Sequence, residues 1–157
     1  MPELPEVETT IKGLIPLIGL KVCKVNIHTK KIRYIVPKGI TKIQKNSKII
    51  NIRRISKYIL LNFSCKFSII FHLGMSGRLK ILNNYYLKEK HDHFVVSFQN
   101  SKHLIFNDPR RFGFIDFDQT KAILSRKYLS ILGIDALSSD LTNKYLFDKI
   151  HKSEVII

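Results

Sequence analysis

Residues 49–82, IINIRRISKYILLNFSCKFSIIFHLGMSGRLKIL, carry the strongest fold signal in the chain. Apolar and β-branched residues form short runs there, and polar or glycine-containing turns separate the runs. Runs of this length with such boundaries are typical of β-strands. We expect strands over residues 49–54, 58–63, 67–73 and 78–82. Their short connections favour antiparallel neighbours.

The strand pattern extends to both sides of this stretch. Val25 and Ile27 alternate with polar residues upstream. Downstream, the runs 93–98 and 104–107 are joined by a short connection that contains Gln99-Asn100-Ser101. Closely spaced strands with tight connections predict an α+β fold that is mainly β: a two-layer antiparallel β-sandwich over roughly residues 20–117, with an N-terminal helix and C-terminal helices.

Helices are expected at the two ends of the sandwich. Pro5 suits a first helical turn, apolar residues follow it at helical spacing, and Pro16 ends the run. The C-terminal part becomes helical again, and Ser139-Asp140 can cap a last helix that carries Leu146 and Ile150. The sequence contains no internal repeat, linker or low-complexity block.

The charge balance points to a polyanionic partner. Lysine and arginine total 27 against 12 aspartate and glutamate residues, which gives a formal net charge of +15. Such an excess destabilises a compact domain through self-repulsion, and it suits a protein whose working partner is nucleic acid. An anionic membrane surface is the weaker alternative, because no stretch approaches the ~18 apolar residues of a membrane span and no long basic amphipathic helix is present.

The cysteines and the N-terminal segment indicate the cellular setting. Cys23 and Cys65 stand alone in apolar, strand-like surroundings without a CxxC motif. The sequence therefore predicts buried reduced thiols and no metal site within the chain. The acidic start, MPELPEVE, lacks the apolar region of a signal peptide. We expect a cytoplasmic protein without membrane association.

Several segments, in the same order, resemble formamidopyrimidine-DNA glycosylases. They are residues 2–9 (PELPEVET), Lys57-Tyr58 with the ILL that follows, residues 72–79 (HLGMSGRL), residues 90–93 (KHDH) and residues 108–113 (DPRRFG). The resemblance extends from residue 2 to about residue 150. Each segment alone is a weak signal, but their common order makes coincidence remote. Leu4 favours the purine-directed family over the related endonuclease VIII type glycosylases, which tend to begin PEGPE.

The resemblance implies a bifunctional DNA glycosylase and abasic-site lyase that removes oxidised purines such as 8-oxoguanine and formamidopyrimidines. Pro2 would be the nucleophile, because removal of the initiator methionine leaves an α-amino group with a pKa of about 8, which is partly neutral at physiological pH. Glu3 would be the acid/base partner that helps to open the sugar. Lys57 would contact the DNA backbone at the lesion and assist β-elimination. Considered alone, Pro2 and Glu3 are more typical of a plain helix start, and Lys57 of a solvated lysine on a strand.

The resemblance also implies a set of DNA contacts. An enzyme that acts on a base takes it out of the stack and leaves a hole in the duplex. Met75 and Phe112 would insert there, and Arg110 would face the base left without its partner. Glycines flank this methionine and follow this phenylalanine, which favours exposed tips over core positions. His91 would contact a phosphate.

Other polar residues near these segments receive structural interpretations or stay open. His91, Asp92 and His93 do not suggest a metal site, because alternate residues of a strand point to opposite faces. His72 and Arg54 are either structural or phosphate-facing.

The resemblance divides the chain into a catalytic β-sandwich domain, residues 1–135, and the start of a helical segment, residues 136–157. In the family that segment leads to a helix-two-turn-helix and a four-cysteine zinc finger, so the family's structural zinc has no ligands here and no cofactor is expected. The family's lysines near this point are replaced by Lys152-Ser153-Glu154. We expect the N-terminal part of a longer, monomeric protein that acts on double-stranded DNA with oxidised purines or abasic sites. By itself this part should bind DNA weakly and turn over slowly or not at all.

Three alternatives remain at this stage. A non-catalytic basic DNA- or RNA-binding module explains the charge, but not the combination of Pro2, Lys57, Met75 and Phe112. A decayed gene fragment would keep the fold and lose the activity. An endonuclease VIII type glycosylase is the alternative enzyme.

Overall fold

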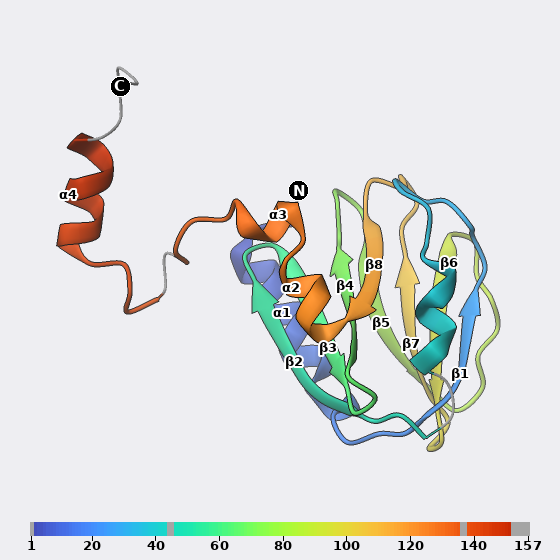
Figure 1. Cartoon of the computed structure of the whole chain (residues 1–157). Coiled ribbons are helices and arrows are strands. Elements are labelled where there is room, and N and C mark those ends of the chain that lie inside the picture. Colours follow the sequence, from blue (N-terminus) through green and yellow to red (C-terminus); the bar gives the residue numbers. More distant parts are fainter. Residues whose placement is uncertain (1, 44–45, 136–137, 152–157) are drawn as a thin grey trace.

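The computed structural model describes residues 2–43, 46–135 and 138–151 (Figure 1). The strands are β1 (Val22–Ile27), β2 (Ile49–Ile55), β3 (Tyr58–Phe63), β4 (Phe67–His72), β5 (Arg78–Asn83), β6 (Asp92–Phe98), β7 (Lys102–Asn107) and β8 (Phe114–Gln119). The helices are α1 (Leu4–Leu14), α2 (Thr120–Leu124), α3 (Lys127–Ser130) and α4 (Asn143–His151), with 3-10 turns η1 (Ile15–Leu17) and η2 (Lys38–Ile43).

Two antiparallel sheets of four strands form the body of the molecule. Their strand orders are β1-β6-β7-β5 and β2-β3-β4-β8, and the two sheets face each other (Figure 1). The predicted two-layer antiparallel sandwich with helices at its ends is confirmed. β6 and β7 are joined across residues 99–101, where Ser101 adopts a positive φ of 59° that allows the tight reversal.

The sheet that carries β3 is covered on both faces. Its inner face contributes to the main core, in which Phe63 and Phe71 are fully buried. On its outer face, Leu60 and Ile70 pack against side chains of α2 and α3. This double burial explains why β3, YILLNF, is almost continuously apolar instead of alternating.

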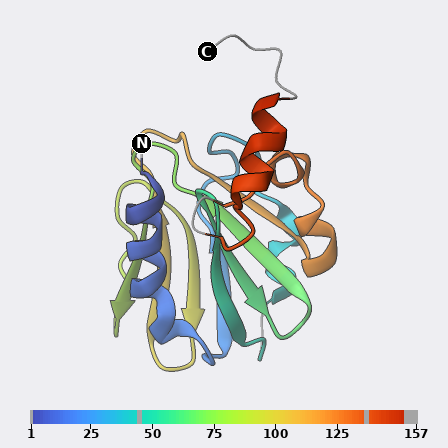
Figure 2. The ribbon, with the colours of Figure 1, turned by 90° about the vertical axis from the view of Figure 1, so that its left-hand side faces the viewer.

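Helix α1 lies beside this sheet, against β2 (Figure 2). Val7, Ile11 and Leu14 are buried on one side of the helix, as the helical spacing in the sequence indicates. Pro5 lies in its first turn, and η1, which contains Pro16, follows directly. The packing of this apolar stripe fixes the direction in which the N-terminal residues point.

Strand β8 was not among the strands expected from the sequence. Asp116 and Asp118 interrupt its apolar residues, and aspartate is depleted in strands. Both carboxylates are paired in the fold: Arg126 Nε lies 2.9 Å from Asp116 Oδ2, and Arg126 Nη2 lies 2.9 Å from Asp118 Oδ2. The ion pairs therefore accommodate two aspartates in a strand that pairs with β4.

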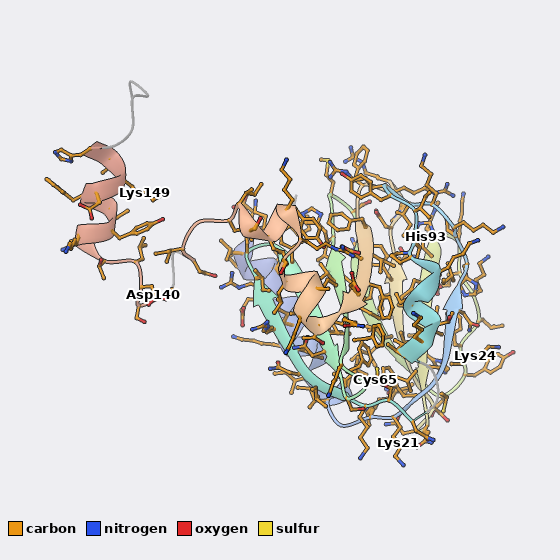
Figure 3. The ribbon with its side chains drawn as sticks, in the orientation of Figure 1. Lys21, Lys24, Cys65, His93, Asp140 and Lys149 are labelled. Atoms are coloured by element: carbon orange, nitrogen blue, oxygen red, sulfur yellow. The ribbon has the colours of Figure 1, made fainter. Side chains whose placement is uncertain are left out.

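The prediction that both cysteines are buried is wrong for Cys23. The pairing of β1 with β6 shifts register between Val22 and Lys24, so Cys23 lies on the exposed side of an irregularity instead of following the alternation. Cys65 is partly buried in the turn between β3 and β4 (Figure 3). Both are free thiols.

The last described helix, α4, lies apart from the sandwich (Figure 1). It starts later than the expected Ser139-Asp140 cap, because Thr142 Oγ1 accepts the Tyr145 N–H at 3.1 Å and caps the first turn. None of its described side chains is buried, so Leu146 and Ile150 are exposed. The division at residues 135 and 136 stays a prediction, and Lys152-Ser153-Glu154 lies outside the described residues.

Among the described helices, none has the length and apolar character needed to cross a membrane.

Candidate functional site

The first turn of α1 holds Glu3, the residue after Pro2, in a defined geometry. The Glu6 carboxylate accepts the backbone N–H of Glu3, and the Glu3 side chain accepts the backbone N–H of Glu6. This reciprocal capping box satisfies donors that the start of a helix otherwise leaves unpaired. Glu3 O also accepts the Val7 N–H at 3.0 Å. The Glu3 side chain remains 72% exposed, so it can still reach a substrate.

Lys57 lies in the turn between β2 and β3, next to the start of α1. Its Nζ is 3.8 Å from Glu3 Oε1, and its side chain is 30% exposed. Ser56, directly before it, has a positive φ of 51°, and this sharp turn separates Lys57 from the end of β2. The structure thus brings together two of the residues that the resemblance singled out, although they are far apart in the sequence.

Arg54 connects the helix and the turn. Its Nε donates to Glu8 Oε2 at 3.1 Å on α1, and its Nη1 donates to Ser56 O at 3.2 Å. Nη1 also lies 2.8 Å from Asp135 Oδ2 in the segment that follows α3. The Arg54 side chain is only 12% exposed. Of the two interpretations left open, the structural one applies: this guanidinium links α1 to the turn that presents Lys57.

Met75 and Phe112 lie on two neighbouring loops and are 47% and 44% exposed. The loops approach so closely that a Cβ on Gly74 would lie 2.4 Å from the backbone nitrogen of Gly113. Gly74 also has a positive φ of 63°. Only glycine fits this contact, because any side chain would collide with backbone that cannot move aside.

Buried Asp108 ties the same two loops together. It is 0% exposed; its Oδ2 accepts the Gly113 N–H at 2.8 Å, and its Oδ1 accepts the Ser76 hydroxyl. Ser76 Oγ in turn accepts the Arg110 N–H at 3.1 Å. The loops that carry Met75 and Phe112 therefore form one unit.

A groove of about 570 Å³ places Pro2 and Met75 on the same surface. Glu6 and Thr10 of α1 form one wall, and the loop and strand from Leu73 to Lys80 form the other. On the neighbouring loop, the guanidinium of Arg110 lies 4.9 Å from the centre of the Phe112 ring. A cation thus accompanies the exposed aromatic ring, which is the arrangement that suits a wedge between bases.

His91 and His93 have different environments. His91 is partly exposed, with a positive φ of 72°, and lines a small cavity of about 290 Å³ with Lys88, Lys90 and Arg111. His93 is buried; its Nδ1 hydrogen-bonds Thr29 Oγ1 at 2.8 Å. In the described part of the chain, no group of three or more histidine, cysteine or acidic side chains could hold a metal ion. The zinc that the resemblance associates with the family has no ligand set there.

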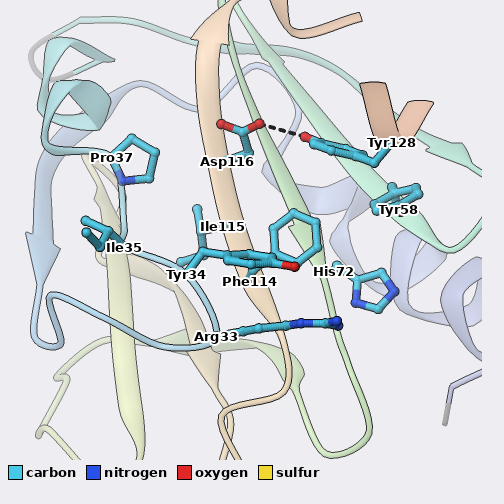
Figure 4. Close-up of a pocket in the computed structure, with 10 residues that line it drawn as sticks. All are labelled: Arg33, Tyr34, Ile35, Pro37, Tyr58, His72, Phe114, Ile115, Asp116 and Tyr128. Carbon is cyan, nitrogen blue, oxygen red and sulfur yellow. Dashed lines mark hydrogen bonds between the residues drawn. The ribbon is translucent and has the colours of Figure 1, made fainter. Parts of the chain in front are cut away.

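Sequence reasoning missed an aromatic pocket of about 390 Å³ close to Lys57 (Figure 4). Its rings come from separate parts of the chain and are those of Tyr34, Tyr58, His72, Phe114 and Tyr128. Single aromatic residues on separate strands give no joint signal in a sequence. His72 belongs to this pocket, and its Nδ1 accepts the Gly74 N–H at 3.1 Å.

The titration of His72 is shifted by this environment. Burial lowers its pKa below the usual 6.5, and the positive charges of Arg33 and Lys57 lower the pKa further. At neutral pH the ring is uncharged. Since Nδ1 accepts the Gly74 N–H, the ring proton is on Nε2.

Residues 1–115 match the family described as "Formamidopyrimidine-DNA glycosylase N-terminal domain". The chain belongs to this family. A formamidopyrimidine-DNA glycosylase of Ruthia magnifica is 41% identical over 150 residues, which are 95% of this chain and 54% of the relative. One from Rickettsia conorii is 40% identical over 158 residues, 100% of this chain and 58% of the relative. The chain spans about half the length of the curated relatives it matches.

Solved structures of formamidopyrimidine-DNA glycosylases share the fold. The Lactococcus lactis enzyme bound non-covalently to DNA with an abasic site has a TM-score of 0.83 and 28% identity, covering 96% of this chain and 58% of that one. Another complex of that enzyme with abasic-site DNA has a TM-score of 0.82 and 27% identity, covering 96% and 57%. These similarities do not favour the alternative interpretations of the chain as a non-catalytic module or an endonuclease VIII type glycosylase.

Proposed function

We propose that this chain provides the catalytic side of a base-excision DNA glycosylase with abasic-site lyase activity, directed at oxidised purines. The observation that carries the proposal is the proximity of Glu3 and Lys57, whose charged groups lie 3.8 Å apart at the start of α1, next to Pro2. The relatives and the net charge of +15 support the same substrate class, double-stranded DNA. Because its substrate would be chromosomal, we place the protein in the bacterial cytoplasm.

In the proposed reaction, Pro2 acts once Met1 has been removed. Its neutral secondary amine attacks C1′ of the sugar, and the bond from C1′ to the damaged base breaks; the base leaves with the electron pair and takes up the proton that the amine loses. Glu3 protonates the ring oxygen as the sugar opens, which yields an iminium between Pro2 and C1′. Loss of a C2′ proton then expels the 3′ phosphate by β-elimination, and hydrolysis releases the enzyme.

The neighbouring side chains would prepare the substrate. Lys57 presents a long, flexible cation to the backbone oxygens of the same nucleotide. Met75 and Phe112, on loops joined by Asp108, would fill the space left by the extruded base. Arg110 would face the unpaired base opposite, and His91 with the lysines around it would contact a phosphate of the duplex.

Covalent trapping tests the proposal. The 157-residue protein is incubated with duplex DNA containing an abasic site, which needs no base extrusion, and sodium borohydride reduces any iminium to a stable adduct. We expect an adduct with the wild type and a weak or absent adduct with Pro2→Gly. Pro16→Gly, in the turn η1 that follows α1, is the matched control and should trap as the wild type does. Intact mass measures the removal of Met1.

The opposite outcome is equally clear. If a preparation with an acetylated N-terminus trapped as well as the free one, another amine would be the nucleophile and the role of Pro2 would be wrong. Lys57→Gln should slow strand nicking more than trapping, whereas Lys12→Gln, at an exposed lysine of α1, should change neither.

The wild-type protein should bind a duplex that contains 8-oxoguanine non-specifically, with a dissociation constant of about 10⁻⁴–10⁻⁶ M that rises steeply with salt, and should excise the base slowly or not at all.

A further inference from the structure

The aromatic pocket near Lys57 combines features of a binding site that the proposed reaction does not use. Phe114 forms its floor, with its ring centre 5.4 Å from that of His72 and its ring nearly parallel to His72, at an interplanar angle of 14°. Tyr34 meets Phe114 edge to face at 5.3 Å. Tyr58 and Tyr128 complete the wall, at 6.1 and 5.6 Å from Phe114. In Figure 4 these side chains surround a space toward which Arg33 also extends.

The mouth of this pocket is apolar and open to solvent. Tyr34 is 55% exposed and Ile35 is 70% exposed, although both are large apolar residues on a segment that precedes η2. Phe114, only 8% exposed, forms the floor. The exposed Tyr34 ring thus meets the buried Phe114 ring edge to face at the mouth of the pocket. Open aromatic surface of this kind marks a ligand site.

The polar groups around the rings select the ligand. The guanidinium of Arg33 lies 5.4 Å from the centre of the Tyr34 ring and contributes positive charge at the mouth. The inner carboxylate, Asp116, is already engaged, since it accepts the Tyr128 hydroxyl at 2.7 Å. Neutral His72 keeps its Nε2–H as a donor. The site therefore offers flat apolar faces, one neutral donor and cations at its rim.

We propose that this pocket binds an unstacked nucleobase of a DNA strand that runs past Lys57, with the attached phosphate at Arg33. Stacking on aromatic faces suits any base, because each base has a flat π-surface, and a cationic rim attracts the backbone. The cavity volume of about 390 Å³ is in the range of small-ligand sites. The proposal rests on the proposed function, which supplies the DNA strand, and it adds a second contact point outside the groove of Pro2.

Binding to single-stranded DNA tests the pocket. The probe is a fluorescein-labelled oligothymidylate of about ten nucleotides, measured by anisotropy with the 157-residue protein. Tyr34→Ala should weaken binding about 5- to 100-fold, the range expected for the loss of one stacked base, whereas Tyr34→Phe should bind as the wild type does. Tyr85→Ala removes a more exposed tyrosine, 78% exposed and outside the pocket, and should change nothing.

Three results would overturn the inference. The first is that Tyr34→Ala weakens binding of a fully paired undamaged duplex as much as binding of the probe. The second is that Tyr34→Phe loses as much probe binding as Tyr34→Ala. The third is full displacement of the probe by an equimolar amount of thymidine monophosphate, which would make the site one for free nucleotides. Phe114→Leu, which keeps apolar volume and removes the ring, provides a second variant and should show the same loss. The borohydride adduct of the wild type reports on the glycosylase assignment, and the loss of probe binding with Tyr34→Ala reports on the pocket, so failure of the pocket and failure of the glycosylase assignment give different patterns.

Discussion

Replacing Asp108 by alanine should loosen both loops that carry the proposed wedge residues. The buried carboxylate accepts the Gly113 N–H at 2.8 Å and the Ser76 hydroxyl, and among the described residues neither donor has another acceptor. A hydrogen bond to a carboxylate contributes about 1.5–3 kcal/mol, and a buried donor left unpaired costs about 1–3 kcal/mol. Since the Ser76 hydroxyl can rotate toward water, we expect a loss of about 3–5 kcal/mol in the free energy of unfolding.

Asparagine at position 108 keeps the shape of the side chain but has one hydrogen-bond acceptor fewer, so it distinguishes the two effects. Asp108→Asn keeps one oxygen that can accept the Gly113 N–H, and Ser76 can reverse its role and accept from the new amide. The expected loss is therefore smaller, about 1–2 kcal/mol. Asp148→Ala, an exposed position on α4, is the matched control and should leave stability unchanged.

Urea unfolding followed by tyrosine fluorescence measures the effect. With a slope of about 1–3 kcal/mol per molar urea, the Asp108→Ala substitution should lower the urea midpoint by about 1–5 M. Hydrogen exchange provides a local readout, since the Gly113 amide should lose protection. A midpoint for Asp108→Ala equal to that of the wild type, or an unchanged Gly113 amide, would refute the reasoning that this carboxylate joins the loops.

Three further predictions follow from named contacts and can be measured by the same unfolding assay. Gly74→Ala should destabilise by more than ~2 kcal/mol, because a Cβ at positive φ meets backbone at 2.4 Å, whereas Gly133→Ala, with open space around it, should be neutral. Arg54→Met should cost about 1–3 kcal/mol, discounted because its carboxylate partners are partly exposed, and exposed Arg53→Met should cost little; equal effects would contradict the linking role. The pKa of His72 in the folded state lies below the usual 6.5, so protonation favours the unfolded chain and the free energy of unfolding should fall as the pH drops below about 6.5. His72→Asn should reduce this fall, and an unchanged pH profile of stability would be the contrary result.

The sequence by itself determined the elements and the family. Short apolar runs between turns indicated most strands, the spacing of Val7, Ile11 and Leu14 indicated α1, and the ordered segments indicated the glycosylase resemblance. These signals are local, because the period of apolar residues reports which face of an element is buried. The sequence predictions failed where tertiary contacts overrode the local pattern. Strand β8 was missed because its aspartates are accommodated by ion pairs in the fold, and Cys23 is exposed at a shift in strand pairing.

Only the tertiary structure decided which distant residues share a site. The contact of Lys57 with Glu3 requires α1 to pack on β2, and Arg54 then holds helix and turn together. The aromatic pocket needs rings from several elements to meet at one end of the sandwich, and Gly74 is explained only by the loop beside it. Such contacts depend on sheet order and loop closure, and a local stretch of sequence does not specify which distant residues will lie next to it.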